Sequence, residues 1–148
     1  MTTLAATCAA VAALLAPLVQ DGTLKRVKTG IAEQTEEFPA AEVRFGLATI
    51  ARDHDGTGLE RTRTRSGVVR LYISRGMRLD LAVPAFMPLI DAVDRAFRAQ
   101  PDLNGCADRF DMTGHGGPPA LDEEIGALFV DVGWVAQELD PDTYVQDW

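Results

Sequence analysis

The sequence has few of the residues from which catalytic and metal sites are usually built. It contains two histidines and two cysteines, and its only serines are Ser66 and Ser74. Neither serine lies in a nucleophile elbow, and only two histidines are available to act as the base of a catalytic triad. Cys8 and Cys106 are too few for a disulfide framework and form no zinc-spaced cluster, so we expect buried thiols in a reducing compartment. No pattern therefore predicts a reaction.

Positive charge is also scarce. The 14 Lys and Arg residues are outnumbered by 22 Asp and Glu residues, which gives a net charge of −8. This balance argues against binding to the phosphate backbone of nucleic acid, but it suits a protein that lies near nucleic acid without adhering to it. With 47% apolar and 24% charged residues, the 148-residue chain is expected to form one globular domain, 1–148.

The first twenty residues carry no charge and are rich in alanine. They lack the basic start of a secretory signal, and alanine with several threonines is too weakly apolar for a membrane span. The larger apolar residues recur at helical spacing: Leu4, Cys8, Val11, Leu15 and Leu18. We therefore expect an N-terminal helix packed on a sheet.

A second helix is predicted to begin between residues 84 and 88, because proline is tolerated in a first helical turn, and to end near Gln100. One apolar stripe marks its buried face: Phe86, Ile90, Val93 and Phe97. Asp91 and Asp94 stand four residues before Arg95 and Arg98, a spacing that favours two ion pairs on the helix surface.

Alternating residues predict strands at 42–50, 68–74, 106–112 and 127–135, with a short strand near 24–29. The expected inward residues are Val43, Phe45 and Leu47; Val69, Leu71 and Ile73; Phe110 and Met112; and Leu128, Val130, Val132 and Trp134. The whole pattern predicts an α+β fold, in which two main helices cover a mostly antiparallel sheet of about four to five strands.

Residues 51–66 are predicted to form a polar hairpin arm. The turn signal DGTG lies at its centre, and Arg61, Arg63 and Arg65 alternate with threonines, which suggests that two strands continue beyond the core. A flexible loop is expected at 114–124. Residues 137–148 are expected to form an exposed acidic tail that ends at Trp148.

One place could hold a metal ion or an acid–base group, and a second is compared with a phosphate-binding loop. Asp53, His54 and Asp55 are suitable ligand types, but neighbouring residues on an extended chain point to opposite sides, so a solvated hairpin tip is the favoured interpretation. His115 lies in GHGG, which lacks the GK[ST] ending of a phosphate loop and is read as a flexible loop. No catalytic, metal or cofactor site is therefore predicted.

Several stretches together carry a resemblance to a known family. They are the Ala/Leu-rich first helix, AEVRFGLATI, SGVVRLYIS, AFMPLIDAVDRAF followed by PDLNGCADRF, and the closing GALFVDVGWVA. In these features the chain resembles the tail terminator proteins of long-tailed bacteriophages, also called tail completion or minor tail proteins. The long hairpin arm and the acidic tail depart from that family pattern.

The resemblance implies a structural virion protein, not an enzyme, and no cofactor. Such a protein would form a hexameric ring with copies of itself, cap the major tail tube protein and present a surface to the head–tail connector. Genomic DNA would pass through the lumen without specific binding. No membrane is implied, and the expected location is the head-proximal end of the tail, after assembly in the host cytoplasm.

A closed ring requires two different patches on each subunit. The candidate basic patch is the hairpin arm, and the candidate acidic patch is the loop and tail. The residues expected at the subunit or tube interface are Arg52, Arg61, Arg63, Arg65, Asp122, Glu123, Glu124 and Trp148. Two alternatives stay open: another phage neck or head-closure connector, and a small α/β ligand-binding domain or enzyme.

Overall fold

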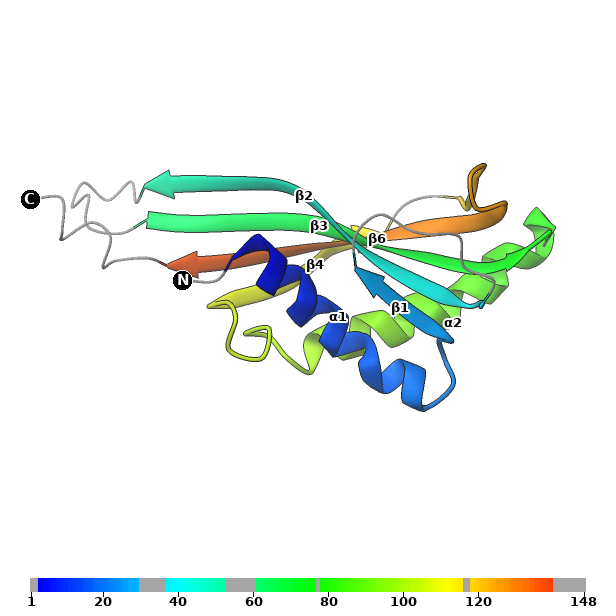
Figure 1. The fold of residues 1–148 in the computed structure, drawn as a ribbon, viewed down its shortest axis with the longest axis horizontal. Helices are drawn as coiled ribbons and strands as arrows, with labels where there is room; N and C mark the ends of the chain where they lie inside the picture. Colours follow the sequence, from blue (N-terminus) through cyan, green and yellow to red (C-terminus); the bar gives the residue numbers. More distant parts are fainter. Residues whose placement is uncertain (1–2, 30–36, 53–60, 77, 116–117, 140–148) are drawn as a thin grey trace, which may run out of the picture.

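A computed structural model describes residues 3–29, 37–52, 61–76, 78–115 and 118–139, and the structural statements below concern those residues. Within them lie two helices and six strands (Figure 1). In chain order these are α1 Leu4–Gln20, β1 Arg26–Thr29, β2 Ala40–Arg52, β3 Arg61–Arg75, α2 Leu79–Arg98, β4 Arg109–His115, β5 Ala120–Asp122 and β6 Ala127–Leu139. The predicted α+β class is confirmed, with more strands than the four to five expected.

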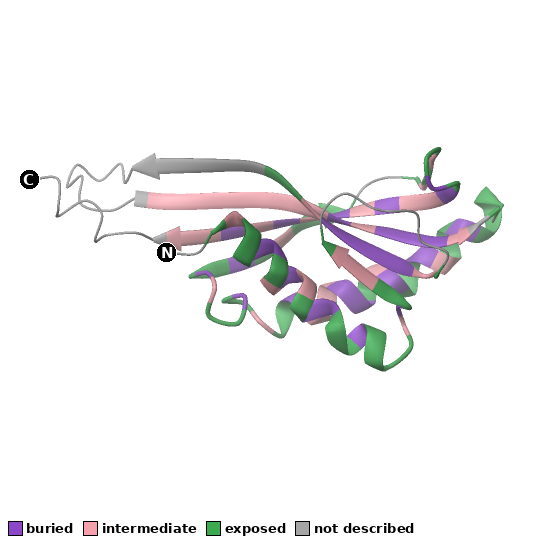
Figure 2. Cartoon of the chain, in the orientation of Figure 1, coloured by how far each residue is buried: buried purple, intermediate pink, exposed green. Residues whose placement is uncertain are grey.

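The six strands form one sheet in the order β1-β2-β3-β6-β4, and β5 pairs with β6 beyond the end of β4. The β1–β2 pairing is parallel, and the other pairings are antiparallel. Both helices lie on one face of this sheet, where buried residues of helices and strands form one large apolar core (Figure 2). Neither of the two described helices covers the opposite face, which we call the helix-free face (Figure 2).

Helix α1 begins at a side-chain cap, because the Thr3 hydroxyl accepts a hydrogen bond from Ala6 N at 3.1 Å. Its predicted apolar residues lie against the sheet, and Cys8, Val11, Leu15 and Leu18 are buried while Leu4 is half-buried. Pro17 lies inside the helix, which continues to Gln20. Burial also raises the pKa of the Cys8 thiol, as expected for a structural cysteine.

Helix α2 begins at Leu79, several residues before the predicted start, so the prediction based on proline was wrong. Pro84 and Pro88 lie within the helix, and both are exposed. Water can therefore hydrate the carbonyl groups that lose an amide partner at each proline. The predicted stripe does face the core, although Ile90 is only half-buried. Of the two expected ion pairs, Asp94 with Arg98 forms, at 3.1 Å.

Strand β2 keeps the predicted alternation as far as Phe45 but not the predicted burial. Val43 is buried as expected, but Phe45 is 63% exposed and Glu42, on the other face, is only 1% exposed. The β2–β3 register is regular from Ala40 to Phe45, so Phe45 lies on the same face as Val43, and it is exposed because the apolar core does not extend over it. An irregularity follows between Phe45 and Ala48, and period-two reasoning cannot anticipate such a bulge.

Two segments expected to be irregular belong to the sheet. Residues 120–122 form β5 within the predicted flexible loop, and residues 137–139 continue β6 into the predicted acidic tail. The β6 extension pairs with β3 as far as Thr62 opposite Leu139. The predicted hairpin arm is therefore three-stranded. We define the arm as residues 48–52 of β2, 61–65 of β3 and 136–139 of β6; it runs to the left in Figure 1, past most of the helical layer.

The body of the sheet meets the arm at a close approach that only glycine permits. Gly67 lies opposite Phe45 on one side and Trp134 on the other. A Cβ atom at position 67 would overlap the carbonyl oxygen of Arg44 and the indole ring of Trp134. Trp134 is itself fully buried, so its ring has little space into which to move.

Candidate functional site

The arm is the first candidate surface, because it contains four of the predicted interface arginines. The backbone of Arg52 lies opposite that of Arg61, and Arg63 lies between Ile50 and Glu138. Arg65 Nη1 forms an ion pair with Glu138 Oε2 at 3.2 Å, and both side chains are largely buried, with 13% and 19% exposed. Part of the expected charge attraction between arm and tail is therefore satisfied within a single chain.

The hairpin tip and the end of the tail lie outside the described residues. This applies to Asp53, His54 and Asp55 at residues 53–60, and to Trp148 at residues 140–148. The prediction of an interface role for Trp148, and the choice between a solvated tip and a metal site at residues 53–55, therefore stay predictions.

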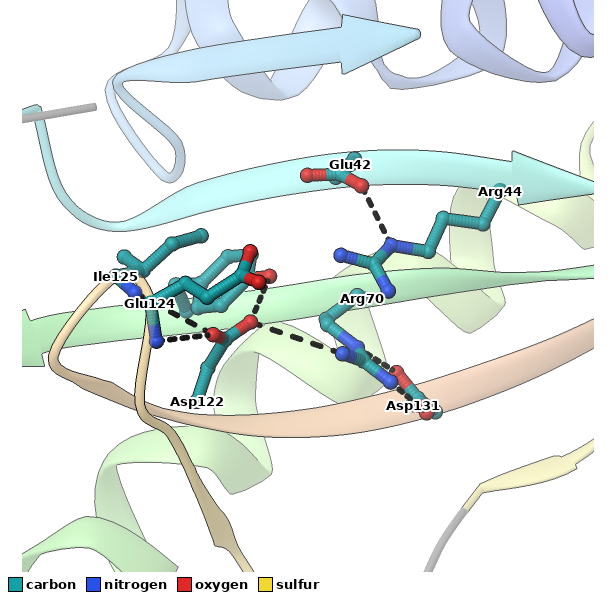
Figure 3. Close-up of polar contacts among 8 residues, drawn as sticks. Glu42, Arg44, Arg70, Asp122, Glu124, Ile125 and Asp131 are labelled. Carbon is teal, nitrogen blue, oxygen red and sulfur yellow. Dashed lines mark hydrogen bonds and ion pairs between the residues drawn. The ribbon is translucent and has the colours of Figure 1, made fainter. Parts of the chain in front are cut away.

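The second candidate surface is the helix-free face of the sheet, where charged side chains form a network (Figure 3). Arg70 of β3 lies opposite Asp131 of β6 and forms two hydrogen bonds with its carboxylate, at 2.8 and 3.1 Å. The hydrogen bonds to Asp131 raise the pKa of the Arg70 guanidinium. Its central carbon also lies 3.8 Å from the centre of the Phe129 ring, a cation–π contact.

Asp122 joins β5 to this network. One of its oxygens accepts a hydrogen bond from the Tyr72 hydroxyl at 2.9 Å and lies 3.7 Å from Arg70. The other oxygen accepts the backbone N–H groups of Glu124 and Ile125 at 3.1 and 3.3 Å, and so holds the turn before β6. Asp122 therefore stabilises its own chain, and the partner contact predicted for it stays a prediction.

Tyr72 is 1% exposed and lies in a small apolar cluster on this face, with Ile125 and Ala127. Its burial and its hydrogen bond to Asp122 raise the pKa of the phenol well above the ordinary value. Tyr72 is thus a neutral hydrogen-bond donor at physiological pH. Glu123 and Glu124, in contrast, are exposed at the turn and are the part of the predicted acidic run that reaches solvent.

Glu42 and Arg44 form the side of the network nearest to β1. The Arg44 side chain donates to one oxygen of the Glu42 carboxylate, which is almost fully buried. This pairing explains how a charged side chain can occupy the third residue of β2, within a buried segment. Sequence analysis placed Glu42 at the start of a strand but gave no sign that it would be buried.

Arg65 and Glu138 bring the predicted basic and acidic patches together within one chain, but the acidic turn that follows Asp122 lies far from the arm. Asp122 lies opposite Ala127 of β6, whereas Arg65 lies opposite Ala136. Nine residues along one strand correspond to about 30 Å at a rise of roughly 3.3 Å per residue. The arm and the acidic turn are therefore separate surfaces near opposite ends of the sheet.

His115 lies exposed at the end of β4. It borders an open hollow of about 350 Å³, whose other lining residues, from α2, the β4–β5 connection and β6, are all apolar, among them Met87, Pro119 and Val130. Within the described residues, no three His, Cys, Asp or Glu side chains are grouped so that they could bind a metal ion.

Sequence analysis missed Arg70, Tyr72 and Asp131 as members of a network. The available signal was weak: their alternation places them on the face opposite the predicted core, but it does not show that two strands bring them side by side. Arginine–carboxylate pairs next to a buried tyrosine can hold strands in register and present a patterned surface. The described part of this network contains no nucleophile paired with a base.

Neither described helix combines the length and the apolar character needed to cross a membrane. No protein-family model matches the chain, and a search of curated proteins finds no significant match, so the fold and the geometry of its surfaces are the basis for any assignment.

Proposed function

We propose that the chain is a phage tail terminator: a structural virion protein that forms a ring on the end of the tail tube, with six subunits as the resemblance implies. The observation that carries the proposal is the arm. Three strands extend past most of the helical layer, and a segment with little core of its own has few reasons to be ordered unless it contacts another protein.

The helix-free face supports the same proposal. It carries paired charges and a half-buried aromatic ring, since Arg70 binds Asp131 and lies over Phe129. Interfaces between subunits commonly combine aromatic side chains with arginine and a polar rim. A surface of this kind suits contacts with neighbouring subunits, with the major tail tube protein or with the head–tail connector protein.

The separation of the two candidate surfaces also suits a ring. A closed ring is built from head-to-tail contacts, in which one patch of a subunit meets a different patch of the next. The arm and the acidic turn lie about 30 Å apart along β6. The net charge of −8 would keep DNA from adhering as it passes through a lumen.

Purified tail tube protein offers a direct test. We expect the chain to stop tube growth, so that tubes assembled with it are short and uniform in electron micrographs, while tubes without it vary in length. The matched variant replaces residues 51–62 with Asn-Gly, a two-residue hairpin turn that joins the paired residues Ile50 and Arg63.

The shortened protein should fold but should not control tube length. The Arg95→Ala variant, altered at an exposed position on α2, should control length as the unmodified chain does. Tubes that grow without limit in the presence of the unmodified chain would contradict the proposal.

A further inference from the structure

Phe45 is an exposed aromatic side chain at one margin of the sheet. It lies on the same face of β2 as the buried Val43, yet it is 63% exposed. β1 pairs with β2 only as far as Val43, so β2 forms the margin of the described sheet at Phe45. An aromatic ring in this position buries a large apolar area when another surface covers it. Among the described residues, the core leaves Phe45 uncovered.

The apolar hollow beside His115 lies at the opposite margin of the sheet, where β4 ends. Two of its lining residues, Val83 and Met87, lie one turn apart on α2 and are 47% and 61% exposed. Methionine adapts its shape to an apolar partner, and a hollow of about 350 Å³ has room for an aromatic side chain. Aromatic side chains that fill such hollows supply much of the binding energy of protein interfaces.

Free charges of opposite sign accompany the two margins. Lys25 and Arg26 are exposed at the start of β1, beside β2. Glu123 is exposed in the turn after β5, and Asp91 is exposed one turn after Met87 on α2. None of these four charged side chains forms an ion pair within the described part of the chain. The margin with the aromatic side chain therefore has free positive charge, and the margin with the hollow has free negative charge.

The register places each charge on the same side of its apolar patch. One row of paired residues crosses the sheet from β1 to β5: Arg26, Ala40, Tyr72, Phe129 and Ala120. Phe45 lies five residues from this row toward the arm, about 16 Å at roughly 3.3 Å per residue. β5 runs away from the arm, so Pro119 of the hollow lies toward the arm and Glu123 lies about 13 Å from it in the other direction. The two separations are similar, so an apolar contact and a charge contact can form together.

We propose that Phe45 inserts into the hollow of a second copy of this chain, where Arg26 then faces Glu123 of that copy. The inference rests on the proposed ring and names its subunit contact. Each chain offers the aromatic side chain at one margin and the hollow at the other, so the contact is head to tail and can repeat around a ring. Opposite charges at the two margins favour this pairing over contacts between like margins.

Two variants, each altered at one patch, test the contact. Phe45→Glu places a charge on the inserted side chain, and Met87→Glu places one in the hollow. Both positions are more than half exposed, so each variant should fold, and thermal unfolding checks this. By sedimentation equilibrium, each variant alone should self-associate at least tenfold more weakly than the unmodified chain. Leu81→Glu is the matched control, because Leu81 is 56% exposed on α2 but does not line the hollow, and it should weaken association less than threefold.

A mixture of the two altered proteins gives the sharpest readout. The Phe45→Glu chain keeps its hollow and the Met87→Glu chain keeps its aromatic side chain, so one intact contact can form between them. The equimolar mixture should therefore contain mixed dimers and no larger species, although each protein alone is monomeric at the same concentration. A mixture that stays monomeric while the unmodified chain assembles would overturn the contact. Equal weakening by Leu81→Glu and Met87→Glu would also overturn it.

Charge reversal tests the second part of the contact. Arg26→Glu and Glu123→Arg should each weaken association by about threefold at low salt, as expected for an exposed ion pair. The double variant, with both changes in every chain, should recover most of that loss, because the opposite charges then face each other in reverse order. A double variant that associates as weakly as the product of the two single losses would overturn the pairing of Arg26 with Glu123.

These outcomes are distinct from failure of the proposed function. If the unmodified chain forms rings that Phe45→Glu and Met87→Glu leave intact, the contact is wrong and the ring stands. If the mixed dimer forms but the unmodified chain builds open filaments, the contact is supported and the ring is wrong. A chain that stays monomeric, alone and in the presence of tail tubes, contradicts both.

Discussion

The Arg65 guanidinium lies 3.2 Å from the Glu138 carboxylate and ties β3 to β6 within the arm. Both side chains are partly shielded, so the pair is less screened than one on an open surface. The third strand of the arm is therefore held by a side-chain contact as well as by its backbone ladder. A contact of this kind keeps the arm ordered as it reaches beyond the helices.

A double-mutant cycle should detect this pair. We expect Arg65→Ala and Glu138→Ala each to lower the free energy of unfolding slightly, with a coupling energy of about 0.5–1 kcal/mol. The coupling should shrink as salt is added. Urea unfolding of the two single variants and the double variant measures it, and a coupling near zero at low salt would show that the arm does not need the pair.

The core between α2 and the sheet predicts a large effect at Phe97. Its ring packs edge-on against Phe110, with centroids 4.9 Å apart, and both side chains are buried. Phe97→Ala should cost about 3–5 kcal/mol, because it leaves a cavity between helix and strand. Arg95→Ala, on the exposed side of the same helix, should change stability by less than about 0.5 kcal/mol. Similar unfolding midpoints for the two variants would show that a different face of α2 packs against the sheet.

At the junction between the body of the sheet and the arm, we expect alanine substitutions of two glycines to differ in their effect on stability. Gly67→Ala should destabilise the fold by about 1–3 kcal/mol or more, because its Cβ would overlap Arg44 and the immobile Trp134. Gly46→Ala places its Cβ 3.3 Å from the Ser66 carbonyl oxygen, a tight contact that small shifts can relieve. Denaturant unfolding should rank Gly67→Ala as clearly the less stable; the reverse order would mean that the strands approach each other elsewhere.

Tyr72 predicts a loss of stability at alkaline pH. Burial and the hydrogen bond to Asp122 raise the pKa of Tyr72 in the folded protein above its unfolded value of about 10. The neutral phenol is thus favoured by folding, so its contribution is complete below pH 10 and is lost as the pH rises beyond it.

The variant Tyr72→Phe isolates this contribution. It cannot ionise, so its free energy of unfolding should fall less steeply between pH 9 and 11 than that of the unmodified chain. At pH 7 it should be less stable by roughly 1 kcal/mol, because Asp122 loses a donor. Parallel pH profiles of the two proteins would show that Tyr72 does not titrate with unfolding.

The sequence predicted the helical stripe on α2 and the alternation of β6, because each element packs one face on a common core. It did not predict the start of α2, since exposed prolines can sit within a helix whose tertiary contacts hold it. The exposure of Phe45 could not be read from its alternation either, because how far the core extends over the sheet depends on tertiary packing.

The candidate surfaces were predicted in part. The arginines of the arm were identified, but Gln137 and Glu138 were assigned to a solvated tail, because acidic residues at the end of a chain give no sign of a strand partner. The network around Arg70 depends on β3 lying beside β6, which is a relationship between residues 61 positions apart. Local patterns contain no information about such a pairing.

The mass of the assembled protein tests the central claim most directly. Sedimentation equilibrium of the full chain, alone and after binding to tail tubes that are then dissociated, should give a species of six chains of 16.0 kDa, about 96 kDa. The species should persist on dilution in the presence of tubes. A protein that remains at 16.0 kDa at every concentration, and does not bind tube ends, would contradict the account of this chain as a ring-forming tail terminator.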